Sequence, residues 1–177
     1  MKLSYAIPVK DELLEITKLL NFLIKNKDDE DEIVILFDSE NGSKGVEDYL
    51  RAKSVNAPKF AWHSYKFDGH FANMKNHLTS LCSGDWIVQL DADEMIGDQF
   101  IPWVKGSIEA NPEVHAFYVP RINTVSNLGL SYVNKWGWNI SKLETHIEEN
   151  EFDLDNPQDL DEYNLLKNNG LIIKEYS

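Results

Sequence analysis

The sequence predicts an α/β fold of three layers, α/β/α, in which helices cover both faces of a mostly parallel central sheet. Strand-like apolar runs alternate with amphipathic helical segments from residue 2 to residue 110, which is the pattern of successive βαβ units. The runs are continuously apolar rather than alternating, as is typical of strands covered on both faces. With 177 residues, 42% of them hydrophobic, the chain is long enough for one domain with a sizeable core.

The individual elements follow from hydrophobic period and turn signals. Strands are expected at residues 2–9, 32–37, 59–65 and 85–90, and helices at residues 11–26, 46–53, 71–83 and 99–110. Beyond them we expect a fifth strand at 115–122, a helix at 156–168 and a last strand at 171–176. Pro120 is expected to end the fifth strand or to place it at a sheet edge.

The charge and cysteine content exclude several classes of function. The formal net charge is −13, which argues against binding a nucleic-acid backbone, although one lysine or a metal ion can still create a local anion site. Cys82 is the only cysteine, so no intrachain disulfide forms and its thiol is expected to be structural. No apolar run is long enough to cross a membrane. The sequence therefore predicts a cytoplasmic protein, either free or peripheral to a membrane.

Acidic residues gather in two places that call for different interpretations. The run Asp28 to Glu32 precedes the second predicted strand and is expected to be a solvated loop. Asp91 and Asp93 come directly after the fourth predicted strand, where alternate residues project to the same side. Two carboxylates at that position suit a hard divalent ion, which prefers oxygen ligands and keeps room for phosphates. The alternative is a solvated turn.

The segment from Phe71 to Glu94 resembles the core of the inverting GT-A glycosyltransferases of family 2. Lys75-Asn76 stand where that family has an Arg-Asn type of pair, and Asp91-Ala92-Asp93 stand at its Asp-x-Asp metal motif. The runs "YAIPVKDE" and "IVILFDSENGS" resemble its first two strands with their loops. The later runs "YVPRIN" and "WGW" look closest to members that decorate lipopolysaccharide cores or occur in viruses and phages.

The resemblance implies a GT-A fold in one domain, with a donor half at about residues 1–97 and a short acceptor half at about residues 98–177. It also implies that a nucleotide diphosphate sugar, most simply a UDP-sugar, binds with Mn²⁺ or Mg²⁺. Asp93 would bind the ion directly, and Asp91 would contact the ribose or metal-bound water. The donor-binding residues it implies are Pro8, Val9, Lys10, Glu12, Asp38, Lys75, Asp91, Ala92 and Asp93.

Single residues within that set keep alternative roles. Asp38 would accept a hydrogen bond from the base, or else cap a turn. Lys75 would reach the donor phosphates, or else lie on a helix surface. Glu94 would position the sugar, or else cap the following helix. Lys10-Asp11 depart from the aromatic or small residue and Asn common in the family, which leaves the identity of the donor open.

The acceptor side carries weaker signals. An inverting transfer needs a carboxylate as the base for the acceptor hydroxyl. The base is expected among Glu94, Glu148, Glu149 and Asp153, with Glu144 and Glu151 as further acids in the same part of the chain. Trp136 and Trp138 either line an acceptor groove or pack against the sheet. His146 is expected to be an ordinary surface or core residue rather than a metal ligand.

The sequence thus predicts a metal-dependent inverting glycosyltransferase that moves a sugar to the hydroxyl of a carbohydrate, glycolipid or protein. Two alternatives stay open. One is a sugar-phosphate nucleotidyltransferase, although "IPVKDELLE" lacks the glycines and the arginine that hold a triphosphate in that class. The other is a nucleotide-binding domain without a complete acceptor site, because only a short segment follows the Asp-x-Asp motif.

Overall fold

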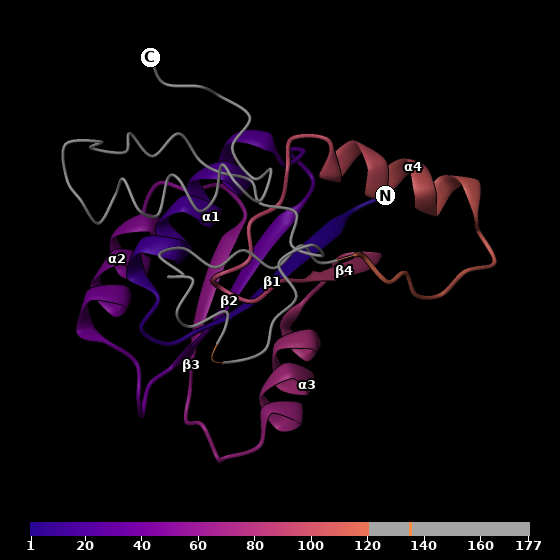
Figure 1. Ribbon diagram of the computed structural model, residues 1–177. Coiled ribbons are helices and arrows are strands. Elements are labelled where there is room, and N and C mark those ends of the chain that lie inside the picture. Colours follow the sequence, from indigo (N-terminus) through magenta and orange to yellow (C-terminus); the bar gives the residue numbers. More distant parts are fainter. Residues whose placement is uncertain (121–134, 136–177) are drawn as a thin grey trace. The chain divides into compact units, whose positions relative to one another are not determined.

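The computed structural model describes residues 1–120 and Lys135 (Figure 1). The chain divides into two units, Met1–Phe117 and Tyr118–Ser177, and the first unit contains the four-stranded sheet described below. Its strands are β1 (Leu3–Val9), β2 (Glu32–Asp38), β3 (Phe60–Tyr65) and β4 (Trp86–Gln89). Its helices are α1 (Leu13–Asn26), α2 (Lys44–Ser54), α3 (Phe71–Leu81) and α4 (Phe100–Ala110). All eight lie where the sequence predicts them.

The four strands form one parallel sheet in the order β3-β2-β1-β4. The order reverses beside β1, because β2 and β3 lie on one side of it and β4 lies on the other. Carboxyl ends of parallel strands meet at one edge of a sheet, and a reversal of strand order there is the usual place for a ligand. The topology therefore predicts a ligand site among the loops after β1, β2, β3 and β4.

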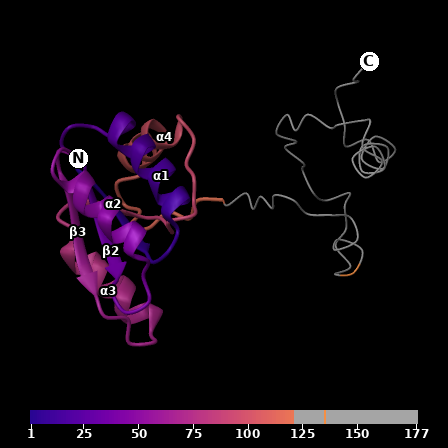
Figure 2. The same ribbon diagram turned by 90° about the vertical axis from the view of Figure 1, so that its left-hand side faces the viewer.

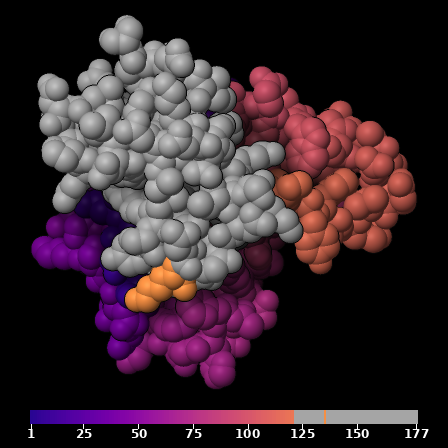
Figure 3. All heavy atoms as spheres, viewed as in Figure 1, coloured from indigo at the N-terminus to yellow at the C-terminus, as the bar shows by residue number. Residues whose placement is uncertain are grey.

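Helices cover both faces of the sheet, as the continuous apolar strands predict. Apolar residues of α1, α2 and α4 pack with one face, and α3 covers the other through Met74 and Leu78 (Figure 1). The turned view in Figure 2 shows the same separation of α3 from α1 and α4. In the space-filling view of Figure 3, α4 lies at one edge of this unit. The three-layer prediction is confirmed for the described residues.

Alternation along β1 shows how the sequence builds the two interfaces. Tyr5 and Ile7 belong to the large cluster with α1, whereas Ala6 belongs to the smaller cluster with α3. In α1, Ile16 and Leu23 are fully buried, which is the one-sided pattern that a helical period predicts. The strands and helices are thus held by burial on both sides of a single sheet.

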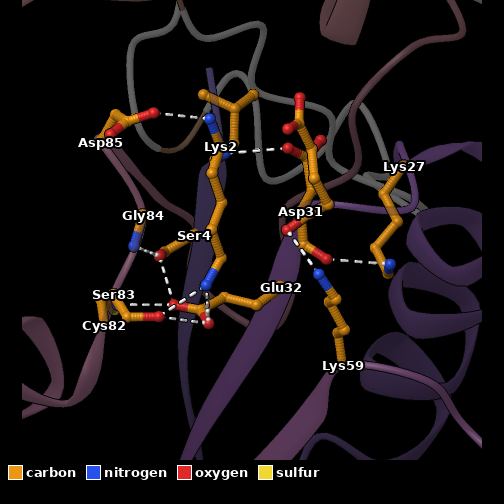
Figure 4. Close-up of polar contacts among 12 residues, drawn as sticks. Lys2, Ser4, Lys27, Asp31, Glu32, Lys59, Cys82, Ser83, Gly84 and Asp85 are labelled. Carbon is orange, nitrogen blue, oxygen red and sulfur yellow. Dashed lines mark hydrogen bonds and ion pairs between the residues drawn. The ribbon is translucent and has the colours of Figure 1, made fainter.

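The prediction of a solvated loop at Asp28 to Glu32 is wrong for its last two residues. Asp31 is fully buried and accepts hydrogen bonds from Leu3 N and Lys105 Nζ at 2.8 and 3.0 Å. Glu32 accepts from Lys2 and from two serines at the opposite end of the sheet from the strand-end loops (Figure 4). Both acids are bound by groups far away in the sequence, so a run of neighbouring acidic residues alone could not predict their burial.

The predicted fifth strand is also wrong over the part that the structure describes. Residues 115–120 have no strand conformation, and Tyr118 is almost fully exposed. Phe117 instead packs its ring on Trp86 of β4, with centroids 5.6 Å apart. Apolar residues here contact the sheet through side chains without adding backbone hydrogen bonds to it. The helix expected at 156–168 and the strand at 171–176 lie outside the described residues.

Candidate functional site

The loops that leave the carboxyl ends of the strands surround one cavity of about 550 Å³. Every donor-binding residue that the sequence predicts lines it. The lining residues are Pro8, Val9, Lys10, Glu12, Asp38, Asn41, Phe67, Phe71, Ala72, Met74, Lys75, Asp91, Ala92 and Asp93. Nine of these were predicted as donor-binding residues, and they come from four separate segments of the chain that the fold brings together.

The loop after β1 is held by the carboxylate of Glu12. Its Oε2 accepts hydrogen bonds from the backbone N–H groups of Lys10 and Asp11, at 2.8 and 3.0 Å. The carbonyl of Lys10 in turn accepts from Ser43 N at 3.0 Å, which joins this loop to the loop after β2. Glu12 therefore shapes the backbone of the cavity wall as well as lining it.

The loop after β2 folds tightly around Asp38. Its Oδ1 accepts from the N–H groups of Glu40 and Asn41, and its Oδ2 accepts from Asn41 Nδ2 at 3.0 Å. Burial raises the pKa of Asp38, but the hydrogen bonds from Asn41 and Glu40 and the nearby charge of Lys10 outweigh it and lower the pKa. Gly42 is required here, because a Cβ would lie 2.3 Å from Asp38 O. Asp38 is thus a turn cap that remains ionised at the cavity.

Asp91 and Asp93 lie in a turn rather than in a strand. β4 ends at Gln89, and the turn is closed by Glu94 N donating to Asp91 O at 3.0 Å. The Glu94 carboxylate accepts from Asp91 N at 2.8 Å in return. Strand alternation, which the sequence suggested, is therefore not what places both acids on the cavity; this reciprocal turn is.

Glu94 does not cap the following helix. α4 begins only at Phe100, and its N-cap residue is Gln99, which makes no capping hydrogen bond through its side chain. Glu94 is also not among the residues that line the cavity. The sequence predicted that Glu94 positions the sugar or acts as the base. In the structure its side chain holds the backbone of the Asp-x-Asp turn.

Lys75 projects from α3 toward the same turn. Its Nζ lies 3.1 Å from Asp91 Oδ1, and both side chains are about 40% exposed. Lys75 thus lines the same cavity as Asp91 and Asp93, and its contact with the donor phosphates stays a prediction.

The apolar wall of the cavity was not predicted from the sequence. Phe67 and Phe71 lie on the loop and first turn after β3, and Ala72 and Met74 continue the wall along α3. The two phenylalanine rings lie 4.9 Å apart between centroids. The signal that was available is the aromatic spacing in "KFDGHF", at the end of a strand whose neighbours all carry polar loops.

The sequence profile of the glycosyl transferase family 2 matches residues 4–159, most of the chain. The chain belongs to glycosyl transferase family 2. This confirms the resemblance found in the sequence at the level of the family. No sequence similar enough to count as a match was found among the curated proteins.

Solved structures share the fold of this family 2 chain. The S. aureus TarS 1-349 crystal structure aligns with a TM-score of 0.57 at 20% identity, over 68% of this chain and 39% of that one. The same protein is similar in its complexes with UDP and with UDP-GlcNAc, at the same identity and TM-score. The chain thus spans less than half of the TarS 1-349 chain, and the likeness establishes the GT-A type of α/β fold.

Two carboxylates of the family 2 chain could hold a divalent ion whose other coordination positions are filled by a bound ligand and water. Asp91 and Asp93 offer carboxylate oxygens at one end of the cavity, the donor type that Mg²⁺ and Mn²⁺ prefer. Within residues 1–120 no group of three histidine, cysteine, aspartate or glutamate side chains is placed to hold a metal. The remaining coordination positions of such an ion would therefore fall to phosphate and water oxygens.

Several predicted residues lie outside the part of the family 2 chain that the structure describes. These are the acceptor-groove residues Trp136 and Trp138 and the acids Glu144, Glu148, Glu149, Glu151 and Asp153, together with His146. Their roles stay predictions. None of the described helices has the length and apolar character needed to cross a bilayer.

Proposed function

We propose that this family 2 chain transfers a sugar from a nucleoside diphosphate sugar, most simply a UDP-sugar, to an acceptor hydroxyl with inversion at the anomeric carbon. A divalent ion, Mn²⁺ or Mg²⁺, held by Asp93 and Asp91, assists the transfer. The acceptor is a carbohydrate, glycolipid or protein.

One observation carries the proposal. Nine residues predicted to bind the donor, from four distant segments, line a single cavity at the carboxyl ends of parallel strands. The S. aureus TarS fold, solved with UDP and with UDP-GlcNAc, supports a donor of this class. A cavity of about 550 Å³ lies within the usual range for a small-molecule site.

The transfer forms one bond and breaks another. The acceptor oxygen attacks the anomeric carbon, the bond from that carbon to the diphosphate breaks, and its electron pair leaves with the diphosphate. The acceptor proton passes to a carboxylate base. A bound divalent ion would stabilise the charge on the diphosphate. Lys75 would add a second positive charge there, while Glu94 keeps the Asp91–Asp93 turn in place.

The acceptor side of the proposal follows the sequence alone. We keep Glu94, Glu148, Glu149 and Asp153 as candidates for the base, and Trp136 with Trp138 as a stacking surface for the acceptor. The single domain with donor and acceptor halves, the likeness to lipopolysaccharide-core or viral members, and a cytoplasmic location are likewise proposals.

The binding half of the proposal is tested by isothermal titration with UDP, with and without Mn²⁺. UDP should bind markedly tighter with Mn²⁺, and Asp93→Ala should abolish that gain, because the exposed Asp93 is a proposed ligand of the ion. Asp98→Ala is a matched control, since Asp98 is an exposed acid of the same segment between β4 and α4 and does not line the cavity. UDP binding that is independent of Mn²⁺ and unaffected by Asp93→Ala would overturn the role of the ion.

Product analysis separates the transferase from its alternatives. Release of UDP from a panel of UDP-sugars is expected for a glycosyltransferase, even when water replaces the acceptor. Release of pyrophosphate from UTP and a sugar phosphate would show a nucleotidyltransferase instead. Tight UDP binding with no turnover of any donor would show a binding domain without a complete acceptor site.

A further inference from the structure

Glu94 holds the Asp-x-Asp turn from a position outside the cavity. Its N–H donates to Asp91 O at 3.0 Å, and its carboxylate accepts from Asp91 N at 2.8 Å. Asp91, Ala92 and Asp93 line the cavity, whereas Glu94 does not. These two hydrogen bonds connect Glu94 to the cavity through the backbone that carries the two aspartates.

The Glu94 carboxylate binds the turn at the edge of the sheet. β4 is an edge strand of the sheet that the described residues form. Leu90 N donates to Ala6 O of β1 at 3.1 Å, and successive N–H groups of an extended chain point to opposite sides. We therefore expect the N–H of Asp91 to point away from β1, toward the side on which β4 has no neighbour among the described strands. Glu94 supplies the acceptor that a neighbouring strand would otherwise offer.

Buried side chains hold the turn from the other side. Ala92 is 4% exposed and Leu90 is 6% exposed, and both belong to the large apolar cluster of the sheet. Asp93, next to Ala92, is exposed. The turn is thus fixed by the core on one side and by Glu94 on the other, and this leaves the two aspartates on the cavity.

Carboxylates hold two other polar loops of the cavity in the same way. Glu12 accepts from two backbone N–H groups of the loop after β1, and Asp38 accepts from two in the loop after β2. Both of these acids also line the cavity, so a ligand can contact them directly. Glu94 makes the same type of contact from outside the cavity, which allows the holding of a loop to be tested apart from the binding of a ligand.

We propose that Glu94 is a positioning residue for the divalent ion, and that its carboxylate raises the affinity of Asp91 and Asp93 for Mn²⁺ by holding their turn in one conformation. The inference rests on the proposed function, because it takes Asp91 and Asp93 as the ligands of the ion. Without the hydrogen bond to Asp91 N, repulsion between the two carboxylates favours conformations that keep them apart. The ion would then have to order the turn in order to bind.

This role requires a hydrogen-bond acceptor at Glu94 and not a negative charge. The N–H of Asp91 is a neutral donor, and the side-chain oxygen of glutamine can accept from it at the same chain length. Aspartate keeps the charge but is one CH₂ group shorter. A base for the acceptor hydroxyl must instead take up a proton, which glutamine cannot do. The variants Glu94→Gln, Glu94→Asp and Glu94→Ala therefore separate the acceptor from the charge.

The test is the affinity of the full chain for Mn²⁺ in the presence of UDP, measured from the electron paramagnetic resonance signal of free Mn²⁺. Glu94→Ala and Glu94→Asp should each weaken Mn²⁺ binding by roughly 10- to 100-fold, as is usual for groups that orient metal ligands. Glu94→Gln should stay within about fivefold of wild type, because it keeps the hydrogen bond. Glu109→Ala, at an exposed acid of α4, is the matched control and should leave Mn²⁺ binding unchanged.

Titration with UDP in the absence of Mn²⁺ distinguishes positioning of the ion ligands from general damage to the cavity. Glu94→Ala should change this affinity far less than it changes the affinity for Mn²⁺, because the complex without the ion does not need the two carboxylates to converge. An equal loss in both titrations would show a merely structural role and would overturn the inference. Far-ultraviolet circular dichroism of each variant verifies that the comparison is made on folded protein.

The remaining outcomes separate this inference from the proposed function. Wild-type protein that binds no Mn²⁺ with UDP would refute the role of the ion in the proposed function, and this inference with it. If Asp93→Ala loses Mn²⁺ binding while Glu94→Ala binds as tightly as wild type, the proposed function stands and the inference is wrong. Glu94→Gln as weak as Glu94→Ala would show that the ion requires the charge of Glu94, which would also overturn it.

Discussion

Lys75 and Asp91 lie in the proposed site for a metal ion and a diphosphate, and their contact is formed before either ligand binds. Two carboxylates that share one rim repel each other, and the Lys75 ammonium 3.1 Å from Asp91 offsets part of that repulsion. The same lysine competes with a divalent ion for Asp91. A diphosphate would relieve the competition, because it offers Lys75 new partners and supplies oxygens to the ion. We therefore expect the ion and the nucleotide to bind together more tightly than either alone.

Lys75→Met should change the affinities for Mn²⁺ alone and for UDP with Mn²⁺ in opposite directions. Affinity for Mn²⁺ alone should rise by about two- to fivefold, since a half-exposed ion pair contributes at most about 1 kcal/mol. Affinity for UDP with Mn²⁺ should fall by roughly 10- to 100-fold, through loss of a charged hydrogen bond to phosphate. Both constants come from isothermal titration, with Lys44→Met on the exposed surface of α2 as control. A fall in both affinities would contradict the competition.

At the scale of the elements, one carboxylate connects three segments of the chain at the end of the sheet opposite the cavity. Glu32 opens β2, and it accepts from Lys2 Nζ and Ser4 Oγ of the first strand segment and from Ser83 after α3 (Figure 4). Gly84 lets the chain approach closely there, because a Cβ would lie 2.6 Å from Ser4 Oγ. This cluster holds the start of β4 beside β1, and β4 carries the Asp-x-Asp turn at its far end.

The Glu32 cluster predicts an acid-dependent loss of stability. Partial burial raises the pKa of Glu32, but hydrogen bonds from Lys2, Ser4 and Ser83 outweigh it and lower the pKa from 4.5 to about 2. The stabilisation is therefore complete above pH 4.5 and is lost as the pH falls toward 2. Glu32→Gln should lower the free energy of unfolding in urea by about 3 kcal/mol at pH 7.

Measuring the free energy of unfolding at several pH values tests whether the stabilisation comes from the charge of Glu32. The difference between wild type and Glu32→Gln should shrink as the pH falls from 4.5 to 2, because the wild-type carboxylate is then protonated as well. Glu47→Gln, in the solvent-facing pair with Arg51 on α2, should change the free energy of unfolding by less than about 0.5 kcal/mol. A difference that stays constant down to pH 2 would show that the charge of Glu32 does not stabilise the fold.

The elements were predictable from the sequence to the extent that their causes are local. Apolar period and continuous apolar runs depend on neighbouring residues, and they predicted all eight described elements and the four loops that form the cavity. Asn41 and Phe71, which line the cavity, were missed because they reach it through two loops that meet beside β2 and β3. Residues 115–120 were assigned wrongly because an apolar run indicates burial and not backbone pairing: Phe117 packs its ring on Trp86 of the edge strand β4, while its own residues have no strand conformation.

At the scale of the whole molecule, the net charge of −13 makes each buried positive charge important. Lys105 of α4 forms ion pairs with Asp28 and with Asp31, which lie more than 70 positions earlier in the chain. Burial lowers the pKa of Lys105, but hydrogen bonds and the charges of Asp28 and Asp31 outweigh it, so its pKa is raised and it stays charged. The pairs join α4, the helix that follows the Asp-x-Asp turn, to the loop between α1 and β2.

Lys105→Met should therefore be far more harmful than the loss of a surface lysine. It leaves the fully buried Asp31 carboxylate without its cation, and such a loss costs about 3–5 kcal/mol of stability. The free energy of unfolding in urea, followed by tryptophan fluorescence, measures it, with the exposed Lys18→Met of α1 as control. Adding Asp31→Asn removes the unpaired charge, so the double variant should be more stable than Lys105→Met alone. If the two changes simply add, the buried charge is not what Lys105 offsets, and α4 is held to the sheet by its apolar face through Ile101 and Ile108.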